Sequence, residues 1–182
     1  YLQIDFCAAK NGGKILDSYY EMTLADAFVL DAGLSAEAEG YDAVCINSMS
    51  DSGLAALRSR LDIPVVGPGQ ACFLTASMLG HQFSVITMWD RWKPLYRKVA
   101  LELEMQNRLV SIESIDTRPD AEELLLGKEE VVFAKLEAAA RRAIDDHGAD
   151  VIILGSTTMH QSAEFLSDAL EVPVLNPGLI AL

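Results

Sequence analysis

Cysteine is scarce in this chain of 182 residues, which has only Cys7, Cys45 and Cys72. An odd and widely spaced set provides neither a disulfide framework nor the paired spacing of a zinc site. Cys45 stands inside an apolar run, where we expect it to be a small buried side chain. We therefore expect no metal ion and a reducing compartment, the cytoplasm.

Positive charge is also scarce. The 14 Lys and Arg residues are outnumbered by 27 Asp and Glu, which gives a formal net charge of −13. Such a surface lacks the cations that neutralise phosphates, so we expect neither a nucleic acid nor a membrane as a partner. A small anionic ligand is still compatible with this charge, because backbone N–H groups can hold one.

Long apolar runs are missing as well. No run approaches the roughly 18 residues of a membrane span, and no signal peptide is visible. Hydrophobic residues nevertheless make up 51% of the chain, which is enough for a substantial core and permits a homo-oligomer. Residues 1–6 have the pattern of a strand, and residues 179–182 begin another apolar segment, so we expect the native chain to continue at both ends.

The chain does contain a regular alternation of short apolar runs and helical segments. The strand-like runs lie near residues 1–7, 41–47, 63–67, 83–88, 108–115, 150–155 and 172–175. The helical segments lie near residues 18–39, 52–61, 70–79, 90–106, 119–147 and 159–170. This alternation predicts an α/β fold with a parallel, doubly wound sheet. Ligands of such sheets bind at the carboxyl ends of the strands, where the strand-to-helix turns gather.

An internal repeat is the most informative feature. Gly40-Tyr41-Asp42 opens an apolar run that ends at Asn47-Ser48, and Gly148-Ala149-Asp150 opens one that ends at Gly155-Ser156. In both copies the serine stands six residues after the aspartate. A helical segment and then a Pro-containing strand and a Pro-Gly turn follow each copy. Self-similarity of this kind predicts two related structural halves.

The repeat predicts two pseudo-symmetric lobes with a cleft between them. We place the first lobe at residues 1–80, completed by the C-terminus and by segments outside this chain, and the second at residues 81–182. Each lobe would present its serine, Ser48 or Ser156, to one small ligand.

Two serine turns, residues 47–53 and 155–159, are short, polar and rich in hydroxyl groups. Helix capping accounts for such residues where a helix begins, and contact with a ligand is the alternative. The N–H groups of these turns would suit a carboxylate or a polarised carbonyl oxygen. The candidate ligand-binding residues come from the two turns, from the end of the strand at 83–88 and from the second Pro-Gly turn: Asn47, Met49, Ser50, Asp51, Thr87, Thr157, Thr158 and Pro177.

The motifs and their order resemble the aspartate/glutamate/hydantoin racemase superfamily, especially its hydantoin racemase branch. The resemblance covers nearly the whole chain and is carried by residues 40–44, 51–54, 63–67, 79–87, 148–155 and 172–177. It implies two α/β lobes around a cleft, and proton transfer next to a carbonyl without a cofactor. It also implies one cysteine in each lobe, one to remove the α-proton and the other to return a proton to the opposite face.

The resemblance places those two cysteines at Ser48 and Ser156, which are both serine in this chain. A serine hydroxyl is a far weaker acid than a thiol and needs a neighbouring base at neutral pH, so the usual two-thiol mechanism is not available. His160 would share a helix face with Ser156 if the turn is helical; an exposed first-turn histidine is the alternative. The candidate catalytic residues are Ser48, Ser156 and His160.

Several functions follow from these residues. We expect a cofactor-independent racemase or isomerase that acts next to a carbonyl of a small amino-acid derivative, a hydantoin-like ring or a carboxylate. A non-catalytic protein that binds a small metabolite is the first alternative. A lyase, a decarboxylase or a hydrolase on the same scaffold is the other, although no Gly-x-Ser-x-Gly elbow surrounds Ser156. The sequence is compatible with natural or engineered serines.

Overall fold

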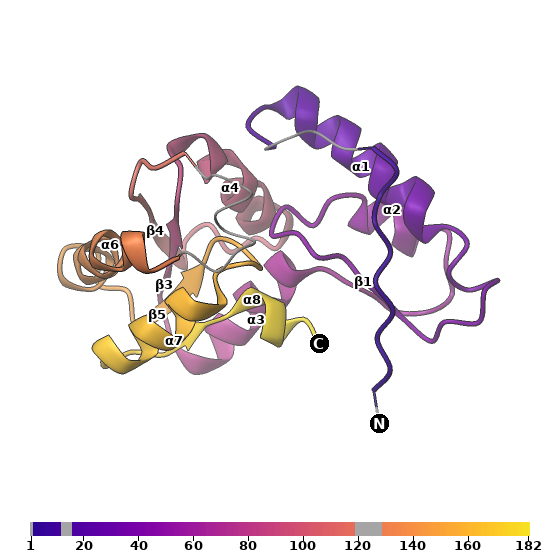
Figure 1. Ribbon diagram of the computed structural model, residues 1–182. Coiled ribbons are helices and arrows are strands. Elements are labelled where there is room, and N and C mark those ends of the chain that lie inside the picture. Colours follow the sequence, from indigo (N-terminus) through magenta and orange to yellow (C-terminus); the bar gives the residue numbers. More distant parts are fainter. Residues whose placement is uncertain (1, 12–15, 119–128) are drawn as a thin grey trace. The chain divides into compact units, whose positions relative to one another are not determined.

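The computed structural model describes residues 2–11, 16–118 and 129–182 (Figure 1). These residues form two compact units. The first comprises Tyr1–Ile46 and Ser52–Val66, and the second comprises Asn47–Asp51 and Gly67–Leu182. The segment Asn47–Asp51 is the first part of the first serine turn, so this part and the second serine turn belong to the same unit.

The first unit is a pair of helices with a short parallel sheet. Its helices are α1 (Tyr19–Gly33) and α2 (Leu54–Arg58), and its strands are β1 (Val44–Cys45) and β2 (Val65–Val66). Ser18 caps α1, because its side chain accepts a hydrogen bond from the Glu21 N–H. The small core contains Ile46, Leu54, Leu57, Leu61 and Val65.

The second unit is built around a four-stranded sheet in the order β4-β3-β5-β6, with every neighbouring pair parallel. Its strands are β3 (Phe83–Thr87), β4 (Leu109–Ser114), β5 (Val151–Leu154) and β6 (Val174–Leu175). Its helices are α3 (Pro68–Leu79), α4 (Lys93–Glu102), α6 (Phe133–Asp145), α7 (His160–Ala169) and α8 (Pro177–Ile180), with 3-10 turns at Asp90–Trp92 and Glu129–Val132. Parallel strands separated by helices confirm the predicted α/β class.

Both faces of this sheet are covered. On one face, Ile86, Ile152 and Leu154 pack in a cluster with residues of α6 and α7. On the other face, Val85 and Ile153 pack in a cluster with residues of α3 and α4. This arrangement explains the continuous apolar run of β5 and the burial of every residue of β3, since a strand covered on both sides has no solvent-exposed face.

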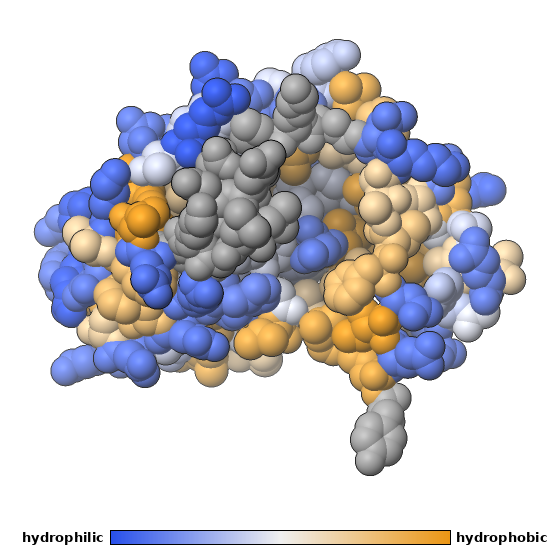
Figure 2. All heavy atoms as spheres, viewed as in Figure 1, coloured by the Kyte–Doolittle hydropathy of each residue, from blue (hydrophilic) through white to orange (hydrophobic). Residues whose placement is uncertain are grey.

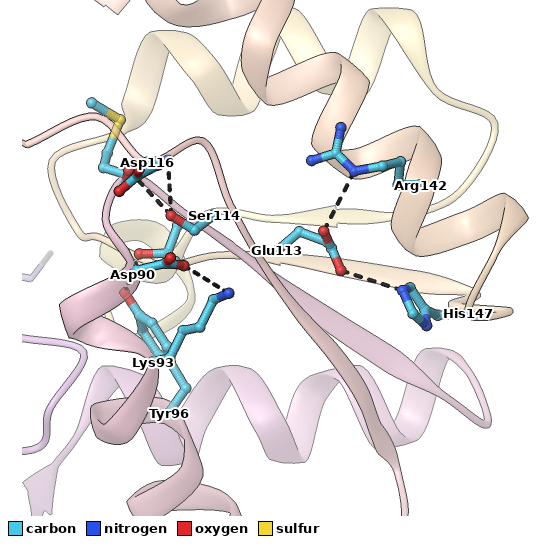
Figure 3. A network of polar contacts seen from close by, with 10 residues as sticks. Asp90, Lys93, Tyr96, Glu113, Ser114, Asp116, Arg142 and His147 are labelled. Carbon is cyan, nitrogen blue, oxygen red and sulfur yellow. Dashed lines mark hydrogen bonds and ion pairs between the residues drawn. The ribbon is translucent and has the colours of Figure 1, made fainter.

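Polar contacts fasten the edge strand β4 to its neighbours (Figure 3). Glu113 lies between Arg142 of α6, at 3.5 Å, and His147 just after that helix, at 3.4 Å. The Ser114 hydroxyl donates to the Met88 carbonyl at 3.5 Å. Asp90 pairs with Lys93 at 2.7 Å, and this hydrogen bond lowers the pKa of Asp90. The Ser114 bond thus joins the end of β4 to the residue after β3, and the Glu113 pairs join β4 to α6 and the residues that follow it.

The strand expected near residues 1–7 is absent from the part of it that the structure describes, residues 2–7. Leu2, Ile4 and Phe6 are 72%, 42% and 89% exposed, and Figure 2 shows apolar atoms at this end of the chain. A strand needs a hydrogen-bonded neighbour, and the described ranges provide no ladder for this segment. Alternation in the sequence was therefore not sufficient to define a strand.

Other boundaries also differ from the sequence prediction. The helix expected at 18–39 ends at Gly33, and turns follow to residue 40. The helix expected at 119–147 falls partly on residues 119–128, outside the described residues; the rest is a 3-10 turn followed by α6. Cys45 is exposed rather than buried, because on the two-residue strand β1 only its neighbour Val44 packs against the core.

A lobe boundary near residue 80 remains a prediction. In the described part of the chain, no helix combines the length and the apolar character that a membrane crossing requires.

Candidate active site

The first serine turn closes on itself through the hydroxyl of Ser48. Its Oγ lies 2.8 Å from the Ser50 Oγ and accepts a hydrogen bond from the Ser50 N–H at 3.4 Å. The Asp51 N–H donates to the Ser48 carbonyl at 3.0 Å. Ser48 is half-buried, whereas Ser50 is only 2% exposed. The Ser48 hydroxyl is thus held by the residue two positions later, the pattern of a serine turn.

The second serine turn repeats this geometry. The Ser156 Oγ lies 2.9 Å from the Thr158 Oγ1 and accepts from the Thr158 N–H at 3.3 Å. The Met159 N–H donates to the Ser156 carbonyl at 3.4 Å. Each bond has its counterpart in the first turn at the equivalent position. The internal repeat of the sequence is therefore also a repeat of local structure.

The two turns lie next to each other within the second unit. The Thr157 hydroxyl points at the Asn47 carbonyl oxygen, with 3.5 Å between the two oxygens, and Thr157 is buried. This contact joins residues 110 positions apart in the chain. The structure thus brings together the two groups of residues that the sequence selected.

Each turn leaves two backbone donors unused. Within residues 2–11, 16–118 and 129–182, the N–H groups of Ser48, Met49, Ser156 and Thr157 donate to no other protein group. Successive N–H groups in a turn form a concave site for a negatively charged or polarised oxygen. The matched pairs of donors can therefore hold two oxygens of one small ligand.

Asp51 is a buried carboxylate that caps a helix. It is 2% exposed and has a φ of 50°. One carboxylate oxygen accepts the Gly69 N–H at 2.8 Å, and the other accepts the Gln70 N–H at 2.7 Å. Capping was one of the two sequence interpretations, but the capped helix is α3. The helix that directly follows the turn, α2, is preceded by Gly53 and has no side-chain cap.

The surroundings of Asp51 change its acidity. Burial raises the pKa of this carboxyl to about 6, although the two N–H bonds and the nearby Lys98 ammonium act in the opposite direction. Lys98 also lies 3.5 Å from the Ser50 carbonyl oxygen and 3.7 Å from Glu102. Sequence reasoning missed Lys98, since nothing local connects it with a turn 48 residues away.

Tyr96 of α4 contacts the backbone at the start of the second turn. Its hydroxyl donates to the Gly155 carbonyl at 2.7 Å and lies 2.8 Å from the Thr87 Oγ1. Tyr96 and Thr87 are fully buried, and burial raises the pKa of the Tyr96 phenol, so it stays protonated. The Thr87 hydroxyl, predicted to face a ligand, is thus bonded to Tyr96; its contact with a ligand remains a prediction.

His160 is the first residue of α7 and is exposed. Its Nδ1 lies 3.1 Å from the Asn176 amide nitrogen, and the Asn176 amide oxygen accepts the Gly178 N–H at 3.1 Å. The Asn176 NH₂ group therefore donates to Nδ1, which places the imidazole proton on Nε2. The structure brings His160 to the turn that contains Pro177, the buried first residue of α8. A catalytic role for His160 remains a prediction, since the Ser156 hydroxyl is bonded to Thr158.

The described residues contain no group of three His, Cys, Asp or Glu side chains arranged to hold a metal ion. The chemistry at the two turns consists instead of hydroxyl and N–H donors, one buried carboxyl group and one imidazole. Together with a parallel α/β sheet, these features define an α/β protein with a duplicated turn rich in hydrogen-bond donors.

Comparison with known proteins agrees with this class. The Asp/Glu/Hydantoin racemase family matches residues 1–182, and this protein belongs to that family. A hydantoin racemase from Pseudomonas sp. (strain NS671) is 32% identical over 184 residues, covering 98% of this chain and 70% of its relative. The family resemblance seen in the sequence is thereby confirmed.

Solved structures show the same fold. An allantoin racemase from Klebsiella pneumoniae matches with a TM-score of 0.85 and 25% identity, over 95% of this chain and 69% of the other. An arylmalonate decarboxylase matches with a TM-score of 0.61 and 20% identity, over 86% and 72% of the two chains. The second likeness concerns the fold alone.

Proposed function

We propose that this protein is a cofactor-independent racemase or isomerase that acts next to a carbonyl group. Its substrate would be a hydantoin- or allantoin-like ring, another small amino-acid derivative or a carboxylate. Ser48 and Ser156 would stand where the usual mechanism of the family has its two thiols. The observation that carries this proposal is the duplicated serine turn, with the same hydrogen bonds and the same unused donors in both copies.

The proposed chemistry uses the two turns in different ways at the same time. Oxygens of the ligand would accept hydrogen bonds from the free N–H pairs, which would stabilise the negative charge that develops when the α-proton leaves. The Ser156 oxygen would take that proton while its own hydroxyl proton passes to Nδ1 of His160, the unprotonated nitrogen, after the imidazole turns away from Asn176. Ser48 would deliver a proton, replaced from solvent, to the opposite face of the carbon atom.

The proposed function also involves the two lobes, the compartment and the partners that we expect from the sequence. The protein would have two pseudo-symmetric lobes, and one cleft would expose both turns to the ligand. We propose a cytoplasmic protein without a nucleic-acid or membrane partner, in which a homo-oligomer is compatible with the composition.

A single experiment tests the activity. The protein is incubated in D₂O with hydantoins, allantoin, aspartate, glutamate, substituted malonates and maleate, and proton NMR follows the α-proton. We expect loss of the α-proton signal for a hydantoin or allantoin. The variants Ser48→Ala and Ser156→Ala should each abolish this exchange, whereas Ser77→Ala, which removes a hydroxyl bonded only within α3, should not. Exchange that survives in both turn variants would exclude serine catalysis.

A specific observation favours a second function, a non-catalytic small-metabolite binder. Each turn serine is paired with another hydroxyl rather than with a base, and the imidazole of His160 is bonded to Asn176. In this case the same NMR samples would show saturation transfer to a ligand without α-proton exchange. A new product peak from a malonate would instead indicate a decarboxylase on the same scaffold.

A further inference from the structure

We infer that Tyr96 is a positioning residue for the second serine turn. Its hydroxyl fixes the peptide between Gly155 and Ser156, so that the Ser156 N–H is held toward the ligand side rather than toward the core. This inference rests on the proposed function only for the use it gives to that N–H group; the orientation of the peptide is a separate, measurable property.

The hydrogen bonds around Tyr96 have only one consistent direction. A phenol has a single proton, and the Gly155 carbonyl, at 2.7 Å, can only accept it. The Thr87 hydroxyl, at 2.8 Å, must then donate to the Tyr96 oxygen. All of these atoms are buried, where a missing partner would be costly. The Gly155 carbonyl is therefore firmly held on the core side.

The geometry of the peptide bond transmits this constraint to Ser156. A trans peptide is planar, and its C=O and N–H point in opposite directions. Because the Gly155 carbonyl points at Tyr96, the Ser156 N–H points away from Tyr96. Consistent with this direction, that N–H donates to no other group among the described residues.

The absence of a side chain at position 155 leaves room for the Tyr96 hydroxyl next to the backbone. A methyl group added to Gly155 would lie 2.5 Å from the Tyr96 oxygen and 3.0 Å from the Thr87 Cβ. Gly155 is also held on its other side, since its N–H donates to the Ile86 carbonyl at 2.8 Å. Only glycine lets the phenol approach the backbone this closely.

In the first turn, the carbonyl group that precedes the serine accepts a longer hydrogen bond. The Asn47 carbonyl, which precedes Ser48, is approached by the Thr157 hydroxyl at 3.5 Å, and Asn47 is exposed. A shorter, fully buried hydrogen bond holds the second turn. We therefore assign the more rigid N–H donor to Ser156.

The test compares Tyr96→Phe with Ser84→Ala. Ser84 is a fully buried residue on β3 whose hydroxyl is bonded to Ser111 at 2.8 Å, so this control also deletes a buried hydroxyl near the sheet, away from the turns. In the free protein, NMR should show a change of the Gly155 carbonyl ¹³C shift and exchange broadening of the Ser156 amide in Tyr96→Phe only. Unchanged Gly155 and Ser156 signals, or equal changes in the control, would overturn the inference.

Turnover gives an independent readout with 5-methylhydantoin as the probe. Loss of one oxyanion donor lowers kcat by about 10²–10³-fold; a loosened donor should lower it about tenfold in Tyr96→Phe, with KM nearly unchanged. If the wild type shows no exchange, the proposed function fails while the signals of the free protein still decide the role of Tyr96.

The wild type alone provides a decisive measurement if Tyr96→Phe does not fold. The Ser156 amide should then exchange with solvent at the rate of an unprotected peptide, while the Tyr96 hydroxyl proton is visible and slow to exchange. Protection of the Ser156 amide by more than about tenfold over an unprotected loop amide would contradict the proposed direction of the peptide.

Discussion

The two serine turns have the same internal hydrogen bonds, but the groups packed behind them differ in charge. Behind Ser48 lie a buried carboxylate, Asp51, and the Lys98 ammonium. Behind Ser156 lies the neutral phenol of Tyr96, and the next helix begins with His160, which is bonded to the neutral amide of Asn176. Repeated sequence thus reproduces a local turn, whereas non-local neighbours give each copy its own electrostatics.

This difference has a chemical consequence. Under the proposed function the two turns would act on opposite faces of one carbon atom and need not be equal, since one would remove a proton and the other supply one. The first turn is coupled to a titrating carboxyl group with a pKa of about 6. The second is held by a phenol that stays protonated. We therefore expect the Asp51 carboxyl to make the first turn sensitive to pH, whereas the Tyr96 phenol adds no such sensitivity to the second.

The largest expected effect comes from restoring thiols at both turns. The double variant Ser48→Cys, Ser156→Cys should exchange the α-proton of 5-methylhydantoin at least about 10²-fold faster than the wild type, because a general base contributes that much or more. The measurement is proton NMR in D₂O. Each single variant should stay well below the double variant, and Ser77→Cys, at a half-buried position on α3, is the control. A folded double variant without any gain would contradict the equivalence of the two turns.

A smaller effect is expected from removing the helix caps. Asp51→Ala leaves the N–H groups of Gly69 and Gln70 without their charged acceptor and should lower the free energy of unfolding by about 2 kcal/mol. Asn176→Ala removes one neutral acceptor at the start of α8 and should cost about 1 kcal/mol. Urea denaturation followed by circular dichroism measures both. Equal losses would show that the charge of Asp51 adds nothing to its cap.

The pH dependence of stability should come from the first turn. Burial raises the folded-state pKa of Asp51 to about 6, above its value in the unfolded chain. The native state then binds more protons between these values, so stability should fall as the pH rises from about 4 to about 6, by an amount on the order of 2 kcal/mol. Asp51→Asn, which cannot ionise, should lack this contribution. A wild-type and variant difference that stays constant over this pH range would refute it.

The smallest effect is expected from the cation next to the first turn. Lys98 lowers the pKa of Asp51, so Lys98→Met should raise it further, by less than about one unit, since the ammonium is partly exposed and screened. The ¹³C shift of the Asp51 carboxyl, titrated by NMR, reports this pKa. Lys93→Met is the matched control, because Lys93 pairs with Asp90. An equal change of the Asp51 pKa in both variants would show that it reflects the net charge of the protein rather than the position of Lys98.

Local patterns determined much of this molecule. The largely apolar run at residues 83–87 and the fully apolar run at 151–154 predicted the buried central strands, because a strand covered on both faces has no solvent-exposed side. The repeat predicted two alike turns, since a serine that bonds to the residue two positions later needs only its neighbours. The apolar alternation of residues 1–7 failed as a guide, because a strand also requires a partner in space.

Tertiary structure alone decided which groups stand behind each turn. Asp51 caps a helix that begins 17 positions after it in the chain. Tyr96 meets the Gly155 carbonyl across 59 residues, and Lys98 meets the Ser50 carbonyl across 48. No periodicity or motif encodes such pairs, since they arise only when separate helices pack on one sheet. The sequence by itself therefore determined the two turns, and packing determined the charge and the rigidity of each.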